Sequence, residues 1–171
     1  MRRVFGITGW KNSGKTTLTE KLVTELVARG WTVSTVKHAH HDFDIDKPGA
    51  DSFRHRQAGA TEVAIVSGRR WALMHELRNE DEPALDDILA QLAPCDIVLV
   101  EGYKREAHKK IEARRVEAKD RAPLSANDPN IVAVAADFIV EGENLPVFDL
   151  DDTKSIADFV EHTMGLAAKT K

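Results

Sequence analysis

Residues 9–16, with the sequence GWKNSGKT, carry two glycines, a lysine and a threonine at the spacing G-x-x-x-x-G-K-[ST]. This pattern is typical of loops that bind the phosphates of nucleotides. Gly9 and Gly14 permit a tight turn in which backbone N–H groups point toward a phosphate. Lys15 supplies a positive charge for the β- and γ-phosphates, and the Thr16 hydroxyl is a suitable ligand for Mg²⁺. The spacing therefore predicts a site for a nucleoside triphosphate and Mg²⁺.

The segments on either side of this loop have the pattern that such a site needs. Residues 3–8 read as a short buried strand that runs straight into the loop. After the loop, Leu18, Leu22 and Leu26 recur at helical spacing, and the helix directs the positive end of its dipole at the phosphates. The candidate nucleotide-binding residues of the loop are Gly9, Lys11, Asn12, Ser13, Gly14, Lys15, Thr16 and Thr17.

A second chemical group is expected beside the loop, at the end of residues 95–102. The continuous apolar run indicates a fully buried parallel strand, and it ends in Glu101 and Gly102. Ligands bind outside the carboxyl ends of parallel strands, so Glu101 is the candidate acid for orienting a Mg²⁺-bound water. Gly102 permits close approach of the backbone to the γ-phosphate. Lys15 and Glu101 are thus the candidate catalytic residues, and Thr16 and Glu101 are candidate metal ligands.

Residues 38–49 form a polar loop that also follows a predicted strand, so we expect it to lie beside the phosphates. The loop contains His38, His40 and His41 together with three aspartates, of which Asp44 is the third candidate metal ligand. Three interpretations stay open: a divalent-cation site, a switch-like loop whose aspartate supports Mg²⁺ through water, and a solvated acidic loop. A Zn²⁺ site is disfavoured because the loop lacks cysteine and adjacent histidines cannot easily face one tetrahedral ion.

The rest of the chain predicts an α/β fold. Residues 31–37 read as a strand parallel to the first, and residues 61–67 and 70–77 read as an antiparallel pair. Charged and apolar residues alternate over 109–115, so an edge strand is expected there. We predict a single P-loop NTPase domain over residues 1–171, with a mostly parallel central sheet, helices on both faces and an antiparallel β extension.

Composition narrows the classes of function. A chain of 171 residues can form one full core, and its net charge of −4 makes nucleic acid an unfavourable partner. Cys95 is the only cysteine, so we expect no disulfide within the monomer and a reducing, cytoplasmic compartment. The first residues lack the apolar stretch of a signal peptide, and no window approaches the ~20 apolar residues of a membrane span.

Five segments together resemble the MobB family, the molybdopterin-guanine dinucleotide biosynthesis adaptor proteins. These segments are residues 9–17, 38–59, 70–74, 100–104 and 131–135. The resemblance covers nearly the whole chain, and the second of these segments is specific to the family. The resemblance implies a GTP-binding adaptor with weak GTPase activity. Such an adaptor assists the attachment of GMP to molybdopterin by partnering the guanylyltransferase of the pathway, and it is expected to be a homodimer.

The resemblance also implies roles for particular residues. Lys15, Thr16 and the backbone of residues 12–17 would hold the phosphates and Mg²⁺, and Glu101 would be the acid on the metal side. The Asn-Lys-x-Asp motif that reads guanine in many GTPases is absent. Asp137, which ends a predicted buried strand, is the candidate to accept hydrogen bonds from guanine N1 and N2. The implied cofactors are GTP and Mg²⁺, the implied reaction is at most slow GTP hydrolysis, and molybdopterin is a second implied partner.

Two other functions remain as alternatives. A metallochaperone-type GTPase would use the three histidines of residues 38–41, although no Cys-Pro-His or Cys-x-His motif is present. An ATP-dependent small-molecule kinase would need a lid with positioned arginines, and Arg54, Arg56 and Arg69 are the candidates for it.

Overall fold

The computed structural model describes residues 2–39 and 43–167. The chain divides into two compact units, one made of Met1–His38 and Gln91–Lys171 and the other of Ala39–Ala90. Each unit has its own β-sheet, so the two are described separately. The expectation of one nucleotide-binding domain stays a prediction. No helix of the described residues is both long and apolar enough to cross a membrane.

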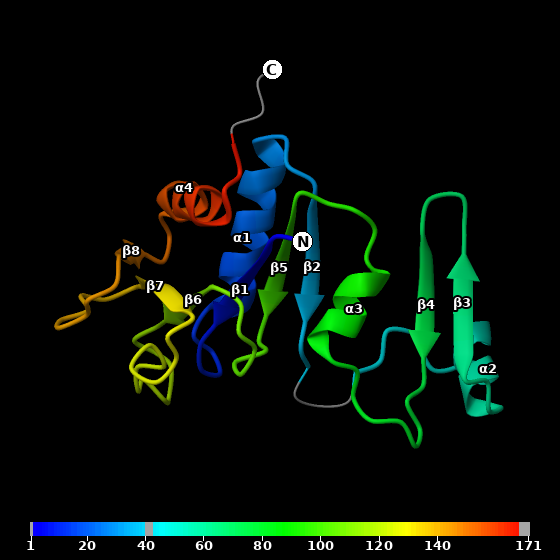
Figure 1. Ribbon diagram of the computed structural model, residues 1–171. Coiled ribbons are helices and arrows are strands. Elements are labelled where there is room, and N and C mark those ends of the chain that lie inside the picture. Colours follow the sequence, from blue (N-terminus) through cyan, green and yellow to red (C-terminus); the bar gives the residue numbers. More distant parts are fainter. Residues whose placement is uncertain (1, 40–42, 168–171) are drawn as a thin grey trace. The chain divides into compact units, whose positions relative to one another are not determined.

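The first unit is built on a six-stranded parallel sheet in which the strands lie in the order β2-β5-β1-β6-β7-β8 (Figure 1). Its elements are β1 (Val4–Thr8), α1 (Lys15–Ala28), β2 (Val33–Lys37), β5 (Ile97–Glu101), β6 (Lys110–Arg114), β7 (Ile131–Ala136), β8 (Val147–Asp149) and α4 (Thr153–Met164). Because all strands run in one direction, their carboxyl ends meet at one edge of the sheet. The register pairs Lys37 of β2 with Glu101 of β5 at that edge.

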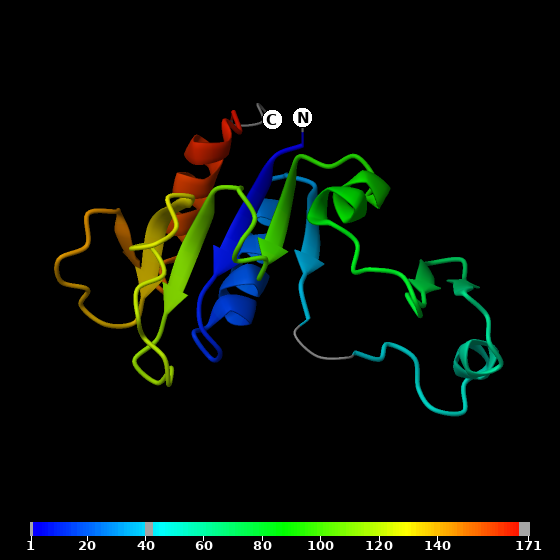
Figure 2. The same cartoon turned by 60° about the horizontal axis from the view of Figure 1, so that its bottom comes forward.

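Helices α1 and α4 cover one face of this sheet, as Figure 2 shows. Leu18 and Leu22 of α1 are buried against the sheet together with Phe5 and Ile7 of β1. Full burial of one such side chain stabilises the fold by about 1.5–3 kcal/mol. The strand–loop–helix order predicted around residues 9–16 is confirmed.

The opposite face of the sheet carries buried charged side chains. Lys110, Glu112 and Arg114 of β6 alternate with apolar residues that belong to the core under α1 and α4. None of the three is more than 7% exposed. The prediction of an edge strand over residues 109–115 is therefore wrong, because β6 lies between β1 and β7. Such an alternation indicates an edge only when no other part of the chain covers the charged face.

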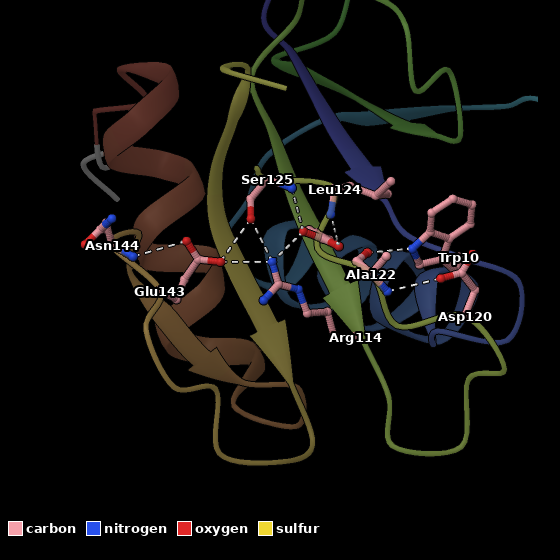
Figure 3. Close-up of polar contacts among 9 residues, drawn as sticks. Trp10, Arg114, Asp120, Ala122, Leu124, Ser125, Glu143 and Asn144 are labelled. Atoms are coloured by element: carbon pink, nitrogen blue, oxygen red, sulfur yellow. Dashed lines mark hydrogen bonds and ion pairs between the residues drawn. The ribbon is translucent and has the colours of Figure 1, made fainter. Parts of the chain in front are cut away.

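Here the segment of residues 116–130 covers the charged face. Glu112 accepts hydrogen bonds from two backbone N–H groups of this segment, at 2.9 and 3.1 Å. Arg114 donates to Glu112 at 2.7 Å and to Glu143 at 2.9 Å. Figure 3 shows Arg114, Ser125 and Glu143 turned toward one another. Because these charges have partners, their burial is tolerated.

His108 packs on this face over Gly6, and its Nε2 atom is buried without a hydrogen-bond partner in the described chain. Burial and the positive charge of Lys110 lower the pKa of His108 to about 4, against the opposing charge of Asp128. Between this pKa and the ordinary value of 6.5, the unfolded chain binds a proton that the folded protein excludes. The free energy of unfolding should therefore decrease as the pH is lowered, by up to about 2 kcal/mol from about pH 7 to about pH 5.

Urea denaturation at the two pH values measures this effect. The variant His108→Gln, which cannot titrate, should lose less stability on acidification than the unchanged protein, by that same amount. An NMR titration that places the pKa of His108 near its ordinary value would contradict the account.

The second unit contains α2 (Asp51–Gln57), β3 (Glu62–Val66), β4 (Trp71–His75) and most of α3 (Leu85–Gln91). Strands β3 and β4 pair in antiparallel fashion, which confirms the predicted antiparallel extension. The Arg56 guanidinium joins parts of this unit, since it pairs with Asp44 at 2.6 Å and with Glu76 at 2.8 Å. Together, the two sheets confirm the predicted α/β class and the mostly parallel central sheet.

Candidate functional site

The loop of residues 9–16 leaves β1 and leads into α1, which begins at Lys15. Gly9 and Gly14 have φ angles of 146° and 91°, which side chains with a Cβ rarely adopt. A Cβ on Gly9 would lie only 2.5 Å from the backbone oxygen of Ala113. The two glycines therefore permit the curled backbone whose N–H groups can surround an anion.

Lys15 lies within this curl, and its Nζ donates to the backbone oxygen of Trp10 at 2.6 Å. Burial lowers the pKa of Lys15, and the positive charges of Lys104 and Lys37 lower it further, while Glu101 has the opposite effect. A cation whose charged form is disfavoured by burial and by other cations is stabilised by an anion. Lys15 is thus held where a phosphate oxygen can replace the Trp10 carbonyl.

Thr16 and Glu101 meet beside Lys15, as predicted from the sequence. The Thr16 Oγ1 donates to Oε1 of Glu101 at 2.8 Å, and Glu101 is 7% exposed. The Lys37 ammonium lies 3.2 Å from the same carboxylate oxygen and 3.4 Å from Thr16 Oγ1. Hydroxyl and carboxylate oxygens are the ligands that Mg²⁺ prefers, and a cationic group already lies against them. The donor set therefore fits a divalent cation.

A hollow of about 400 Å³ opens beside the loop. Its lining residues are Asn12, Ser13, Gly14, Lys15, Thr16, Thr17, Arg115 and Glu117. Pockets that hold small ligands have volumes of about 300–1,000 Å³. Lys15 and Arg115 place positive charge on the wall of the hollow, and Glu117 places negative charge there. The hollow thus suits a ligand that is anionic near Lys15.

Trp10 connects the loop to neighbouring segments. Its indole Nε1 donates to the backbone oxygen of Ala122 at 2.7 Å, a contact drawn in Figure 3. The Lys104 ammonium lies 4.1 Å from the centre of the Trp10 ring, within the range of a cation–π interaction. Segments 103–109 and 116–130 are therefore both in contact with the loop through one side chain.

Besides Gly9, three predicted nucleotide-binding residues lie outside the lining of the hollow. Lys11 is exposed. Gly102 follows β5 with a φ of 94°, and a Cβ there would lie 3.1 Å from the side chain of His38. Asp137 follows β7, and its Oδ1 accepts a hydrogen bond from the backbone N–H of Val116 at 2.8 Å. The nucleotide-binding roles of these three residues stay predictions.

The predicted roles of the loop after β2 also stay untested. Asp44 belongs to the second unit, where its carboxylate pairs with Arg56. His40 and His41 lie outside the described residues. Within residues 2–39 and 43–167, no group of three or more His, Cys, Asp or Glu side chains is placed to hold a metal.

Sequence reasoning missed Lys37, Arg115 and Glu117. Lys37 is the last residue of a parallel strand, and the rule that selected Glu101 could have selected it too. Arg115 and Glu117 follow β6 directly. The sequence prediction placed residues 109–115 at an edge of the sheet, whereas β6 lies beside β1, which leads into the loop. Neither Arg115 nor Glu117 was therefore expected beside the loop.

The chain is similar in sequence to a family of known proteins. The family model of MobB, described as molybdopterin guanine dinucleotide synthesis protein B, matches residues 4–137. A molybdopterin-guanine dinucleotide biosynthesis adapter protein of Escherichia coli (strain K12) is 38% identical over 163 residues, covering 94% of this chain and 93% of the relative. The adapter protein of Haemophilus influenzae is 41% identical over 162 residues, covering 93% of this chain and 88% of the relative.

The fold is also similar to that of solved structures. The crystal structure of a MobB homologue from Bacillus stearothermophilus aligns with a TM-score of 0.73 and 35% identity, covering 96% of this chain and 99% of that chain. This likeness confirms the predicted P-loop NTPase fold.

Proposed function

Because the chain belongs to the MobB family of molybdopterin-guanine dinucleotide synthesis proteins, we propose that it is a GTP-binding adapter protein of that biosynthesis. The observation that carries the proposal is the contact of Thr16 with Glu101 beside a correctly formed phosphate loop. This arrangement supports the binding of a triphosphate together with Mg²⁺.

Different residues of the loop would contact the phosphates and the Mg²⁺ ion. Backbone N–H groups of residues 12–17 and the start of α1 face the phosphates. Lys15 exchanges the Trp10 carbonyl for oxygens of the β- and γ-phosphates. Thr16 ligates Mg²⁺ and Glu101 holds one of its waters; when bound, this ion neutralises phosphate charge.

We propose that hydrolysis of GTP is slow and that the protein acts through its partners. Glu101 already accepts a hydrogen bond from Thr16 and lies against Lys37, so it suits orienting a water better than removing a proton. Turnover should therefore lie below the range of about 1–10³ s⁻¹ typical of enzymes. The proposed partners are the guanylyltransferase of the pathway and molybdopterin, and the proposed location is the cytoplasm.

A homodimer is part of the proposal, supported by the surface of the second unit. The β3–β4 pair exposes Val66 and Trp71, at 75% and 70%, together with Ile65 and Leu73. A two-stranded sheet is marginally stable alone in water, so packing against a second copy would stabilise it. Light scattering should give a mass near twice 19.0 kDa.

Glu101 offers a specific prediction about the metal. The variant Glu101→Gln keeps an oxygen that can accept from Thr16 but removes the charge that favours Mg²⁺. We expect affinity for GTP with Mg²⁺ to fall about tenfold, the lower end of the 1.5–3 kcal/mol of a charged hydrogen bond. Affinity measured in EDTA should not fall. An equal loss in both conditions would contradict the metal-side role.

Calorimetric titration with GTP and ATP in the presence of Mg²⁺ tests the proposed function. We expect saturable binding with tighter affinity for GTP, slow release of phosphate, and a complex with the guanylyltransferase on gel filtration. ATP-dependent phosphorylation of a metabolite, or an absence of GTP binding, would overturn the proposal.

A further inference from the structure

A tight turn at the carboxyl end of β6 forms one wall of the hollow. The Ala118 N–H donates to the backbone oxygen of Arg115 at 3.1 Å, which closes the turn. Asp137 anchors the turn to β7 in two ways. Its backbone N–H donates to the backbone oxygen of Arg114 at 3.3 Å, and its carboxylate accepts from the backbone N–H of Val116 at 2.8 Å. The turn is therefore held by the sheet itself.

Two residues of this turn, Arg115 and Glu117, line the hollow. Glu117 is also exposed to solvent, as is Val116 between them. Arg115 lies directly against the phosphate loop, since a Cβ on Gly14 would lie 2.9 Å from its Nε. That Nε is buried without a hydrogen-bond partner in the described chain. Two residues of opposite charge thus border the same hollow.

The negative charge of Glu117 is unexpected at a site for phosphates, because a carboxylate repels phosphate oxygens. It is favourable opposite a part of the ligand that donates hydrogen bonds. The Watson–Crick edge of guanine presents two adjacent donors, N1–H and the 2-amino group, and a carboxylate can accept both. Adenine presents an unprotonated N1 at the same place, which a carboxylate repels.

We propose that Glu117 is the residue that selects guanine over adenine, and that Asp137 positions it by holding the turn. This inference rests on the proposed binding of GTP to the same hollow. Arg115 supplies positive charge against Gly14, beside the proposed place of the phosphates. Asp137, the carboxylate expected from the sequence to read the base, acts through Val116 instead.

Nucleotide titrations with matched amide variants test the proposal. Glu117→Gln should lower GTP affinity by about 10–100-fold, the equivalent of the 1.5–3 kcal/mol of a charge-assisted hydrogen bond, and should not lower ATP affinity, because the glutamine no longer repels adenine N1. It should also raise affinity for xanthosine triphosphate, whose carbonyl oxygen at position 2 can accept from the glutamine amide. Misfolding cannot produce that gain. Asp137→Asn, which still accepts from Val116, and the exposed control Glu141→Gln should keep the GTP preference.

Each alternative gives a different result. A switch to xanthosine triphosphate in Asp137→Asn and not in Glu117→Gln would overturn the assignment in favour of Asp137. An equal loss for GTP and ATP in Glu117→Gln would overturn it too, since the carboxylate would then bind the ribose. If the unchanged protein binds GTP and Glu117→Gln has no effect, the inference fails and the proposed function stands. If the unchanged protein does not bind GTP, both fail.

Discussion

Replacement of Lys15 by alanine is expected to lower the affinity for GTP by about 10–100-fold, an effect on binding as large as any that we expect from one side chain. The Lys15 ammonium is half-buried inside the phosphate loop, and its present partner is a single backbone oxygen of Trp10. A triphosphate would replace that neutral acceptor by charged oxygens, which form stronger hydrogen bonds. The loss should be similar for GTP and ATP, because the lysine contacts only phosphates.

Calorimetry on Lys15→Ala checks this result, with the exposed Lys154→Ala of α4 as the matched control. The thermal midpoint of Lys15→Ala should stay close to that of the unchanged protein, since one hydrogen bond to Trp10 is lost. Unchanged affinity for the triphosphate in a folded Lys15→Ala protein would show that the nucleotide binds elsewhere.

Replacement of Glu112 by alanine is expected to have the largest effect on stability, a loss of about 3–5 kcal/mol in the free energy of unfolding. Glu112 is 1% exposed and accepts from Arg114 and from the backbone N–H groups of Leu124 and Ser125. Its removal leaves two partly buried N–H groups without their acceptor and Arg114 with one carboxylate fewer. The segment that carries Trp10's partner Ala122 should also loosen.

Urea denaturation of Glu112→Ala measures this loss. Glu112→Gln, which retains the shape and one of the two acceptor oxygens, should lose less. The exposed Glu141→Ala should stay within about 0.5 kcal/mol of the unchanged protein. A loss below about 1 kcal/mol in Glu112→Ala would mean that the buried charges of β6 do not hold segment 116–130 in place.

Local patterns were enough to predict the phosphate loop and its acid. The glycine spacing, the apolar strand before it and the leucine period after it all describe contacts between residues close in sequence. Glu101 could be found because a continuous apolar run marks a buried parallel strand and the acid ends it. The pairing of that acid with Thr16 follows from the parallel strand order.

The wall formed by β6 could not be predicted in the same way. Its charged residues read as solvent-facing because their partners lie further along the chain, for example 13 residues away at Ser125 and 29 residues away at Glu143. Only the folded chain shows that Arg114 is neutralised and that β6 is central. Arg115 and Glu117 become candidates for ligand binding once this position is known. The base-reading role assigned to Asp137 came from its place at a strand end, which does not reveal its bond to Val116.

A structure of the protein with a non-hydrolysable GTP analogue and Mg²⁺ tests the central claim most directly. The account predicts β- and γ-phosphate oxygens within hydrogen-bond distance of Lys15 Nζ, which has left the Trp10 carbonyl. It also predicts Mg²⁺ bound to Thr16 Oγ1 with one of its waters on Glu101. A nucleotide bound away from the loop of residues 9–16, or Lys15 still donating to Trp10 beneath a bound nucleotide, would contradict it.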